Sequence, residues 1–72
     1  MTLRPLSYRE LVRRLKRYGF RLYRQGKGSH ELWVRDEDGL VVPVPRKNTD
    51  IRKGTIRAII RHIGVDFDDF MK

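Results

Sequence analysis

The sequence predicts an α+β domain in which a helix, three antiparallel strands and a second helix follow one another. A helix-capping pattern precedes apolar residues at helical spacing near the N-terminus. Three short runs rich in β-forming residues follow, joined by turns that contain glycine. A stripe of isoleucines at helical spacing stands near the C-terminus. Because the links are short, we expect an antiparallel meander with both helices on one face and the other face open. At 72 residues, the chain is expected to form one domain over residues 1–72.

The first helix is predicted from a capping box, in which Ser7 is followed three residues later by Glu10. Gly19 is expected to end it, because glycine adopts the left-handed conformation without penalty. Its apolar residues fall at helical spacing and are Tyr8, Leu11, Val12, Leu15 and Tyr18. The opposite face is basic and carries Arg9, Arg13, Lys16 and Arg17, with Arg14 to one side.

Strands are predicted over residues 20–25, 30–35 and 40–44. In the first strand, Phe20 and Leu22 are expected to face the core. The core-facing residues of the second strand are taken to be Leu32 and Val34, with Glu31, Trp33 and Arg35 on the other face. Proline cannot donate a ladder hydrogen bond, so Pro43 and Pro45 predict that the third strand is an edge strand or ends there.

The second helix is predicted from the apolar positions Ile56, Ile59, Ile60 and Ile63. Gly64 is expected to end this helix, while its start is open, with Thr49 or Asp50 as the candidate cap. A short helical turn capped by Asp66 is predicted to fold Phe67 and Phe70 back on the core.

Charge and composition restrict the function. The net charge is +8, and residues 1–35 hold all of the excess, with ten Lys/Arg against two Asp/Glu. Such asymmetry favours nucleic acid, an acidic protein or an anionic membrane surface over a merely solvated surface. The chain has no cysteine, which excludes disulfides and thiolate metal sites. No apolar run is long enough to cross a bilayer, and Met1-Thr2-Leu3-Arg4 lacks the apolar stretch of a signal peptide. We therefore expect a cytoplasmic protein without a membrane partner.

The tetrapeptide Lys27-Gly28-Ser29-His30 is the candidate functional motif. It places a histidine after a cationic turn and at the start of an apolar strand. Histidine is the side chain best suited to proton transfer near neutral pH. The competing interpretation is a half-exposed strand histidine that packs beside the sheet. The other histidine, His62, is explained by its place near the end of the second helix, where a cation meets the helix dipole.

Several segments, in this order along nearly the whole chain, resemble the HicA (YcfA-like) toxin family of toxin–antitoxin systems. The matching segments are Gly19-Phe20, Gln25-Gly26-Lys27-Gly28-Ser29-His30, Val42-Pro43-Val44-Pro45, Lys53-Gly54-Thr55-Ile56 and Ile63-Gly64. The resemblance implies a double-stranded-RNA-binding-like fold and a type II toxin that cleaves mRNA. It also implies that His30 is catalytic and that a HicB-type antitoxin covers the active site. Many relatives carry a second histidine after the third-strand proline, where this chain has Arg46 and Lys47. We assign Arg46 and Lys47 to phosphate contact.

RNA cleavage without a metal or cofactor, which is what we expect here, requires a base, an acid and cations near the phosphate. His30 supplies the base or the acid, and the sequence does not decide which. The surrounding positive charge disfavours the protonated imidazole and so slightly favours the role of base. Arg24 and Lys27 are candidates for phosphate contact, against the alternative of a solvated hairpin. Gly28 lets the backbone approach a phosphate, and Ser29 either orients His30 or binds a phosphate oxygen. No second acid or base is visible in the sequence.

Two other functions compete with the ribonuclease. One is a non-catalytic RNA-binding module of the same fold, which does not require the Gly-Ser-His turn. The other is a protein-interaction module whose basic face holds an acidic partner. Tyr23 and Trp33 are both expected to face away from the core. The sequence leaves three roles open for them: an aromatic platform for bases, an antitoxin contact, or a cross-strand pair.

Overall fold

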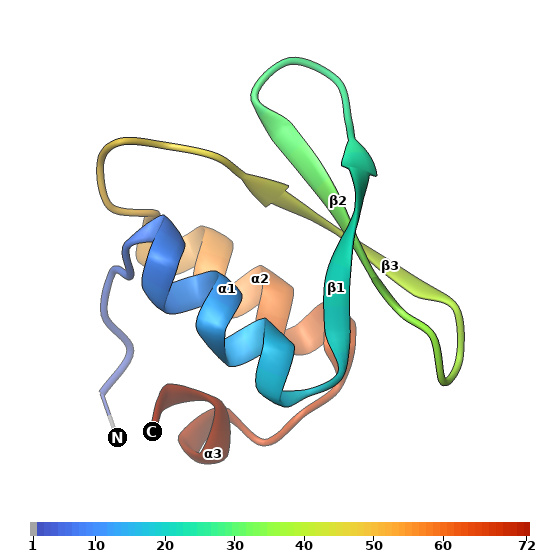
Figure 1. Cartoon of the computed structure of the whole chain (residues 1–72). Helices are drawn as coiled ribbons and strands as arrows, with labels where there is room; N and C mark the ends of the chain where they lie inside the picture. Colours follow the sequence, from blue (N-terminus) through green and yellow to red (C-terminus); the bar gives the residue numbers. More distant parts are fainter. Residues whose placement is uncertain (1) are drawn as a thin grey trace.

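A computed structural model describes residues 2–72 and shows a helix, a three-stranded sheet and two further helices (Figure 1). The prediction that no signal peptide is present was based on residues 1–4, and Met1 lies outside the described residues. The elements are α1 (Tyr8–Arg17), β1 (Phe20–Gln25), β2 (His30–Arg35), β3 (Leu40–Pro45), α2 (Lys53–Ile63) and α3 (Phe67–Met71). The predicted α+β fold is confirmed, and its topology is that of a double-stranded-RNA-binding-like domain.

The sheet has the order β1-β2-β3, and both strand pairs are antiparallel. Helices α1 and α2 pack side by side on one face of the sheet, as predicted (Figure 1). Strand β3 is an edge strand, in agreement with Pro43 and Pro45. Neither proline has an N–H group, and the carbonyl of Val41 on the same strand is 3.0 Å from Nε2 of His62. The outer edge of β3 is therefore largely closed to another strand.

Local capping determines where α1 begins. The Ser7 hydroxyl accepts a hydrogen bond from the Glu10 N–H, and the Glu10 carboxylate accepts one from the Ser7 N–H, both at 3.0 Å. The capping box is thus confirmed. The predicted ends of the two long helices are also confirmed, with Gly19 and Gly64 in the left-handed region at φ values of 87° and 71°.

The start of α2 differs from the prediction. Its N-cap is Arg52, which makes no side-chain capping bond, so neither Thr49 nor Asp50 caps the helix. The cause is a contact from a distant part of the chain. Ile51 and Leu6 exchange two backbone hydrogen bonds, of 2.7 and 3.2 Å, in an isolated antiparallel bridge. This bridge holds residue 51 in an extended conformation and delays the helix.

The assignment of the β2 faces is wrong. Trp33 is only 3% exposed and belongs to the core cluster, whereas Leu32 and Val34 lie on the opposite face of the sheet, where Val34 is buried but stands outside that cluster. The pairing register explains this, because Trp33 stands opposite Val42, and Val42 faces the helices. Both faces of β2 carry large apolar residues, so alternation alone does not identify the core face.

In β1, Leu22 also departs from the expected pattern, while its neighbour Tyr23 follows it. Leu22 was expected in the core but is about half exposed. It lies beside an irregularity in the β1–β2 register that leaves Tyr23 without a paired residue. Because β1 is an edge strand, its side chains have strand neighbours on one side only. Tyr23 is exposed as predicted, but it forms no cross-strand pair with Trp33, whose partner in β1 is Leu22.

The core lies between the helices and the sheet, and α3 closes it at one end (Figure 1). The predicted isoleucine stripe of α2 is confirmed as buried. Asp66 caps α3 by accepting a hydrogen bond from the Asp69 N–H, and Phe70 is fully buried. The largest fully buried side chains are those of Phe70, Leu6, Leu11, Leu15, Ile51, Ile56, Val42 and Val44.

One arginine of α1 has a structural role that the sequence did not indicate. Arg14 is 3% exposed. Its guanidinium donates to the carbonyls of Phe70 at 3.0 Å, Met71 at 3.4 Å and Glu10 at 3.2 Å. Carbonyls at a helix C-terminus have no intrahelical donor, and Arg14 supplies one for α3. Arg17 reinforces the contact by donating to the Asp69 carbonyl at 2.8 Å.

Replacing Arg14 with leucine is expected to lower the free energy of unfolding by about 2–3 kcal/mol, because buried carbonyls then lose their charged donor. Urea unfolding followed by circular dichroism measures this change. The control is Arg13→Leu, at an exposed position on the same helix, which is expected to change stability little. Equal losses in the two variants would show that Arg14 does not hold α3.

Candidate functional site

The structure brings the backbones of the predicted site residues together at one end of the sheet, with the Arg46 guanidinium on the helix side, beside Tyr8. His30 begins β2 and stands opposite Pro45, the last residue of β3. The Arg46 N–H donates to the Ser29 carbonyl at 2.9 Å, which joins the end of β3 to the β1–β2 turn. Lys47 follows directly and is exposed. Figure 1 shows this hairpin projecting beyond the two long helices.

Backbone hydrogen bonds hold the turn before His30. The Gly26 N–H donates to the His30 carbonyl at 2.8 Å, and the His30 N–H donates to the Lys27 carbonyl at 3.2 Å. Gly28 has a φ of 62°, and a side chain added there would meet no heavy atom within 4 Å. The glycine is therefore required by conformation rather than by crowding, and its backbone is open to an approaching ligand.

Gln25 braces the same turn with its side chain. Its amide Nε2 donates to the His30 carbonyl at 2.8 Å and to the Gly28 carbonyl at 3.2 Å. The sequence indicates no role for Gln25 beyond its place in the family-like segment. Its position next to the glycine-containing turn was the one available signal. We regard Gln25 as a residue that positions the backbone of the candidate site.

The imidazole of His30 is exposed on the open face of the sheet, the face that carries Leu32 and Val34. Within residues 2–72, no side chain or backbone group forms a hydrogen bond with the ring. The helices cover the other face (Figure 1). The ring is therefore available to a ligand that approaches the open face.

Free cations surround this histidine. Arg24 pairs with Leu32 across the strands, so it shares the open face, and its guanidinium lies 5.8 Å from the centroid of the Tyr23 ring. Arg24, Lys27 and Lys47 are exposed, and in the described part of the chain none of them has a carboxylate partner. Of the two candidate aromatic platform residues, Tyr23 remains accessible and Trp33 is excluded by its burial.

A buried carboxylate behind the site was missed at the sequence level. Glu31 is 2% exposed and faces the helices. One carboxylate oxygen accepts hydrogen bonds from the Tyr8 hydroxyl at 2.5 Å and from the Trp33 indole N–H at 3.2 Å. The other oxygen accepts from the Arg46 guanidinium at 3.2 Å. A lone glutamate within an apolar strand was the signal that such a network existed.

The network determines the protonation of its members. Burial, together with the bond to Glu31, raises the pKa of Tyr8 to about 12. Burial alone also raises the pKa of Glu31, but the hydrogen bonds from Tyr8, Trp33 and Arg46 outweigh it and leave that pKa below the ordinary value. At neutral pH, Glu31 is therefore a carboxylate and Tyr8 a neutral donor committed to it.

Arg46 belongs both to this network and to the surface. It forms the ion pair with Glu31, and its guanidinium lies 5.2 Å from the centroid of the Tyr8 ring. Its side chain is nevertheless 65% exposed. A guanidinium has five N–H donors in a fixed fork, so donors beyond the one used for Glu31 remain for an external anion.

The second histidine lies elsewhere. His62 is bound to the Val41 carbonyl, and Val41 precedes Pro45 by four residues on β3. At about 3.3 Å per residue, this is roughly 13 Å along the strand from the position opposite His30. The two imidazoles therefore do not form one site.

No helix within residues 2–72 is both long and apolar enough to cross a membrane. Across the same residues, no three His, Asp or Glu side chains are grouped so that they could hold a metal ion. The candidate site consists of a histidine, a glycine turn and exposed cations.

Comparison with known proteins identifies the family. The family model described as the HicA toxin of bacterial toxin–antitoxin systems matches residues 8–65. This span runs from the first residue of α1 to just beyond α2 and includes every predicted site residue. A search of curated proteins found no match. Because the family model covers most of the chain, the protein belongs to the HicA toxin family of bacterial toxin–antitoxin systems.

Proposed function

We propose that this HicA-family protein is an endoribonuclease that cleaves mRNA and uses His30 to transfer a proton. The observation that carries the proposal is the exposed imidazole of His30 beside the open backbone of Gly28 and the free cations Arg24 and Lys27. Membership of a toxin family supports a destructive activity, and the positive charge favours a polyanionic substrate. The substrate class proposed is therefore mRNA.

The reaction uses a nucleophile that RNA already carries. The 2′-oxygen attacks the adjacent phosphorus while its proton is removed, and the bond to the 5′-oxygen breaks as that oxygen is protonated. The products are a 2′,3′-cyclic phosphate and a 5′-hydroxyl. A positioned histidine contributes roughly 10²–10⁴-fold as the base or the acid. His30 takes one of these two roles.

The remaining site residues bind the phosphate. Arg24, Lys27 and Lys47 lower the energy of negative charge that develops on the phosphate oxygens. The open backbone at Gly28 allows close approach, and the Ser29 hydroxyl is adjacent to the imidazole in the chain. The position of Arg46 is held by Glu31, which reduces the freedom lost when its other donors bind a phosphate.

Among residues 2–72, neither Tyr8 nor His62 is placed to serve as a second proton-transfer group for His30. Tyr8 is committed to Glu31 and has a pKa of about 12, so it is a poor acid at neutral pH. His62 is bound at the far end of β3. Water, a cation or the RNA itself therefore completes the reaction.

Control of such an enzyme requires that the open face be covered. We assign this role to a HicB-type antitoxin that binds over His30, in the cytoplasm where mRNA is found. The excess of positive charge and the exposed Tyr23 on the hairpin suit an acidic protein with apolar contacts.

The proposal predicts that the purified protein cuts a labelled single-stranded RNA in the presence of a chelator. An RNA with a 2′-deoxynucleotide at the cut position is expected to resist cleavage there, because its nucleophile is missing. Gel analysis and identification of a cyclic phosphate end check both results. Salt-sensitive binding without strand scission would instead favour the non-catalytic RNA-binding module.

A further inference from the structure

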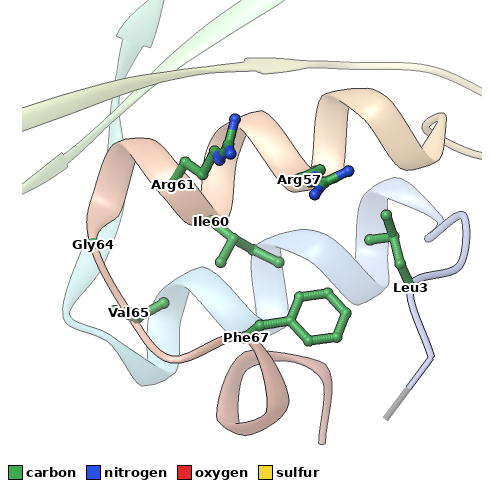
Figure 2. Close-up of a pocket in the computed structure, with 7 residues that line it drawn as sticks. All are labelled: Leu3, Arg57, Ile60, Arg61, Gly64, Val65 and Phe67. Carbon is green, nitrogen blue, oxygen red and sulfur yellow. The ribbon is translucent and has the colours of Figure 1, made fainter.

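A groove lies on the helical side of the molecule, between α2, α3 and the N-terminal segment. Its volume is about 550 Å³, within the range of roughly 300–1,000 Å³ that is typical of ligand sites. The groove is lined by Leu3, Arg57, Ile60, Arg61, Gly64, Val65 and Phe67. Figure 2 shows Val65 and Leu3 towards its two ends, with Ile60 and Phe67 between them.

The floor of the groove is apolar. Ile60 is almost completely buried, whereas Leu3, Val65 and Phe67 are only partly buried against the core. Apolar surface that remains partly exposed gains free energy when another apolar side chain covers it. The floor therefore favours an apolar anchor rather than a purely polar ligand.

Two arginines add positive charge to this groove. Arg57 and Arg61 stand one turn apart on α2, and both are exposed (Figure 2). Considering residues 2–72, neither forms an ion pair or a hydrogen bond through its side chain. Arg14 and Arg17 differ, since they bind the carbonyls of α3. Like charges four residues apart on a helix repel one another, and an external anion relieves this repulsion.

Charge and shape select among the candidate occupants. A second copy of this chain also carries a net charge of +8, so long-range repulsion opposes self-association. Arg57 and Arg61 suit RNA phosphates as well as carboxylates, but unstacked bases need flat surfaces to stack on, and the floor of this groove is aliphatic except for Phe67. An acidic polypeptide satisfies both the arginines and the aliphatic floor.

We infer that this groove binds an acidic segment of a partner protein through an apolar anchor side chain. No residue of the groove belongs to the sheet, and His30 lies on the open face that the helices leave uncovered. The two sites can therefore be occupied together. This inference does not depend on RNA cleavage, and either can fail without the other.

The test uses a synthetic 12-residue peptide in which aspartate and glutamate flank a Leu-Phe pair. Nuclear magnetic resonance titration of the ¹⁵N-labelled full chain is expected to shift the signals of groove residues and to leave the His30 hairpin unchanged. The double variant Arg57→Glu/Arg61→Glu is expected to bind at least about 10-fold more weakly, because two attractive charges become repulsive. The control Arg9→Glu/Arg13→Glu makes the same change in net charge at exposed positions of α1 and is expected to retain binding.

Two further measurements separate a loss of specific contacts from unfolding and test the apolar anchor. Circular dichroism shows whether the charge-reversed protein is folded, and Arg57→Gln/Arg61→Gln tests the same contacts if it is not. Replacing the Leu-Phe pair of the peptide with serine is expected to abolish binding. The inference is overturned if the peptide does not bind, binds the His30 hairpin, or is weakened equally by the α1 control. A 12-nucleotide RNA that shifts the groove signals, or self-association that depends on Arg57 and Arg61, also overturns it.

Discussion

His30→Ala is expected to reduce RNA cleavage by about 10²–10⁴-fold, because the proposed reaction loses its one positioned proton-transfer group. The fold is expected to survive, since the imidazole makes no hydrogen bond within the described residues 2–72 and lies on the open face of the sheet. Cleavage of labelled RNA measures the rate. Growth of cells that express the variant provides a second measurement, in which growth inhibition is expected to disappear.

The matched control is His62→Ala, which removes the chain's other histidine. This variant loses the contact with the Val41 carbonyl and is expected to retain cleavage. Full activity in a folded His30→Ala protein would refute the catalytic assignment. In the wild type, a cleavage rate that rises with pH favours His30 as the base, and a rate that falls with pH favours it as the acid.

Glu31→Ala is expected to lower the free energy of unfolding by about 3–4 kcal/mol, because the substitution leaves buried donors without their shared acceptor. Those donors are the Tyr8 hydroxyl and the Trp33 indole, and Arg46 loses its ion-pair partner. A domain of this length has a total stability of roughly 4–11 kcal/mol. A large share of the protein is then expected to unfold at moderate urea concentrations, and urea titration measures the difference.

The pH dependence separates charge from packing at this position. The pKa of Glu31 is lower in the folded state than its ordinary value of 4.5. Its stabilising contribution is therefore present above that ordinary value and is lost as the pH falls through the folded pKa. Wild type is expected to exceed Glu31→Gln in stability at pH 7, and the difference is expected to shrink below about pH 4. A constant difference across this range would show that packing, not charge, accounts for the effect. Glu37→Gln, at an exposed glutamate, is the control for a general charge effect.

Features determined by neighbouring residues could be predicted from the sequence. Ser7 and Glu10 are three residues apart and bond to each other, so the start of α1 follows from the local pattern. The glycines at the helix ends and the isoleucine stripe of α2 are local in the same sense. The Lys27–His30 turn is also contiguous, which is why most of the candidate site was recognisable.

Features determined by distant contacts could not be predicted in this way. The start of α2 depends on a bridge between Leu6 and Ile51. The core face of β2 depends on its pairing with β3, because Trp33 and Val34 are both apolar. Arg14 looked like a surface cation, yet the last turn of the chain buries it. Predicting these features requires knowing which distant segments pack together, and local sequence patterns do not contain that information.

The role of Arg46 shows the same limit at the site itself. Its proximity to Ser29 follows from the strand register, whereas its ion pair with Glu31 depends on the face that Glu31 occupies. A phosphate contact was predicted for Arg46 from its charge and from its place after the third-strand proline, where many relatives carry a histidine. The observed ion pair shows that Arg46 belongs both to the candidate site and to the buried network of Glu31. A substitution at Glu31 is therefore expected to affect both the core and the position of Arg46.

The two edges of the sheet are unequal, and this restricts assembly. Pro43, Pro45 and the bond between His62 and Val41 obstruct the outer edge of β3, while β1 forms the opposite edge. Endless ribbons and fibrils need two accessible edges on every subunit, so that each copy joins one neighbour on either side. With one edge obstructed, strand pairing between copies ends at a single closed pair. The architecture therefore protects this HicA-family protein against runaway polymerisation.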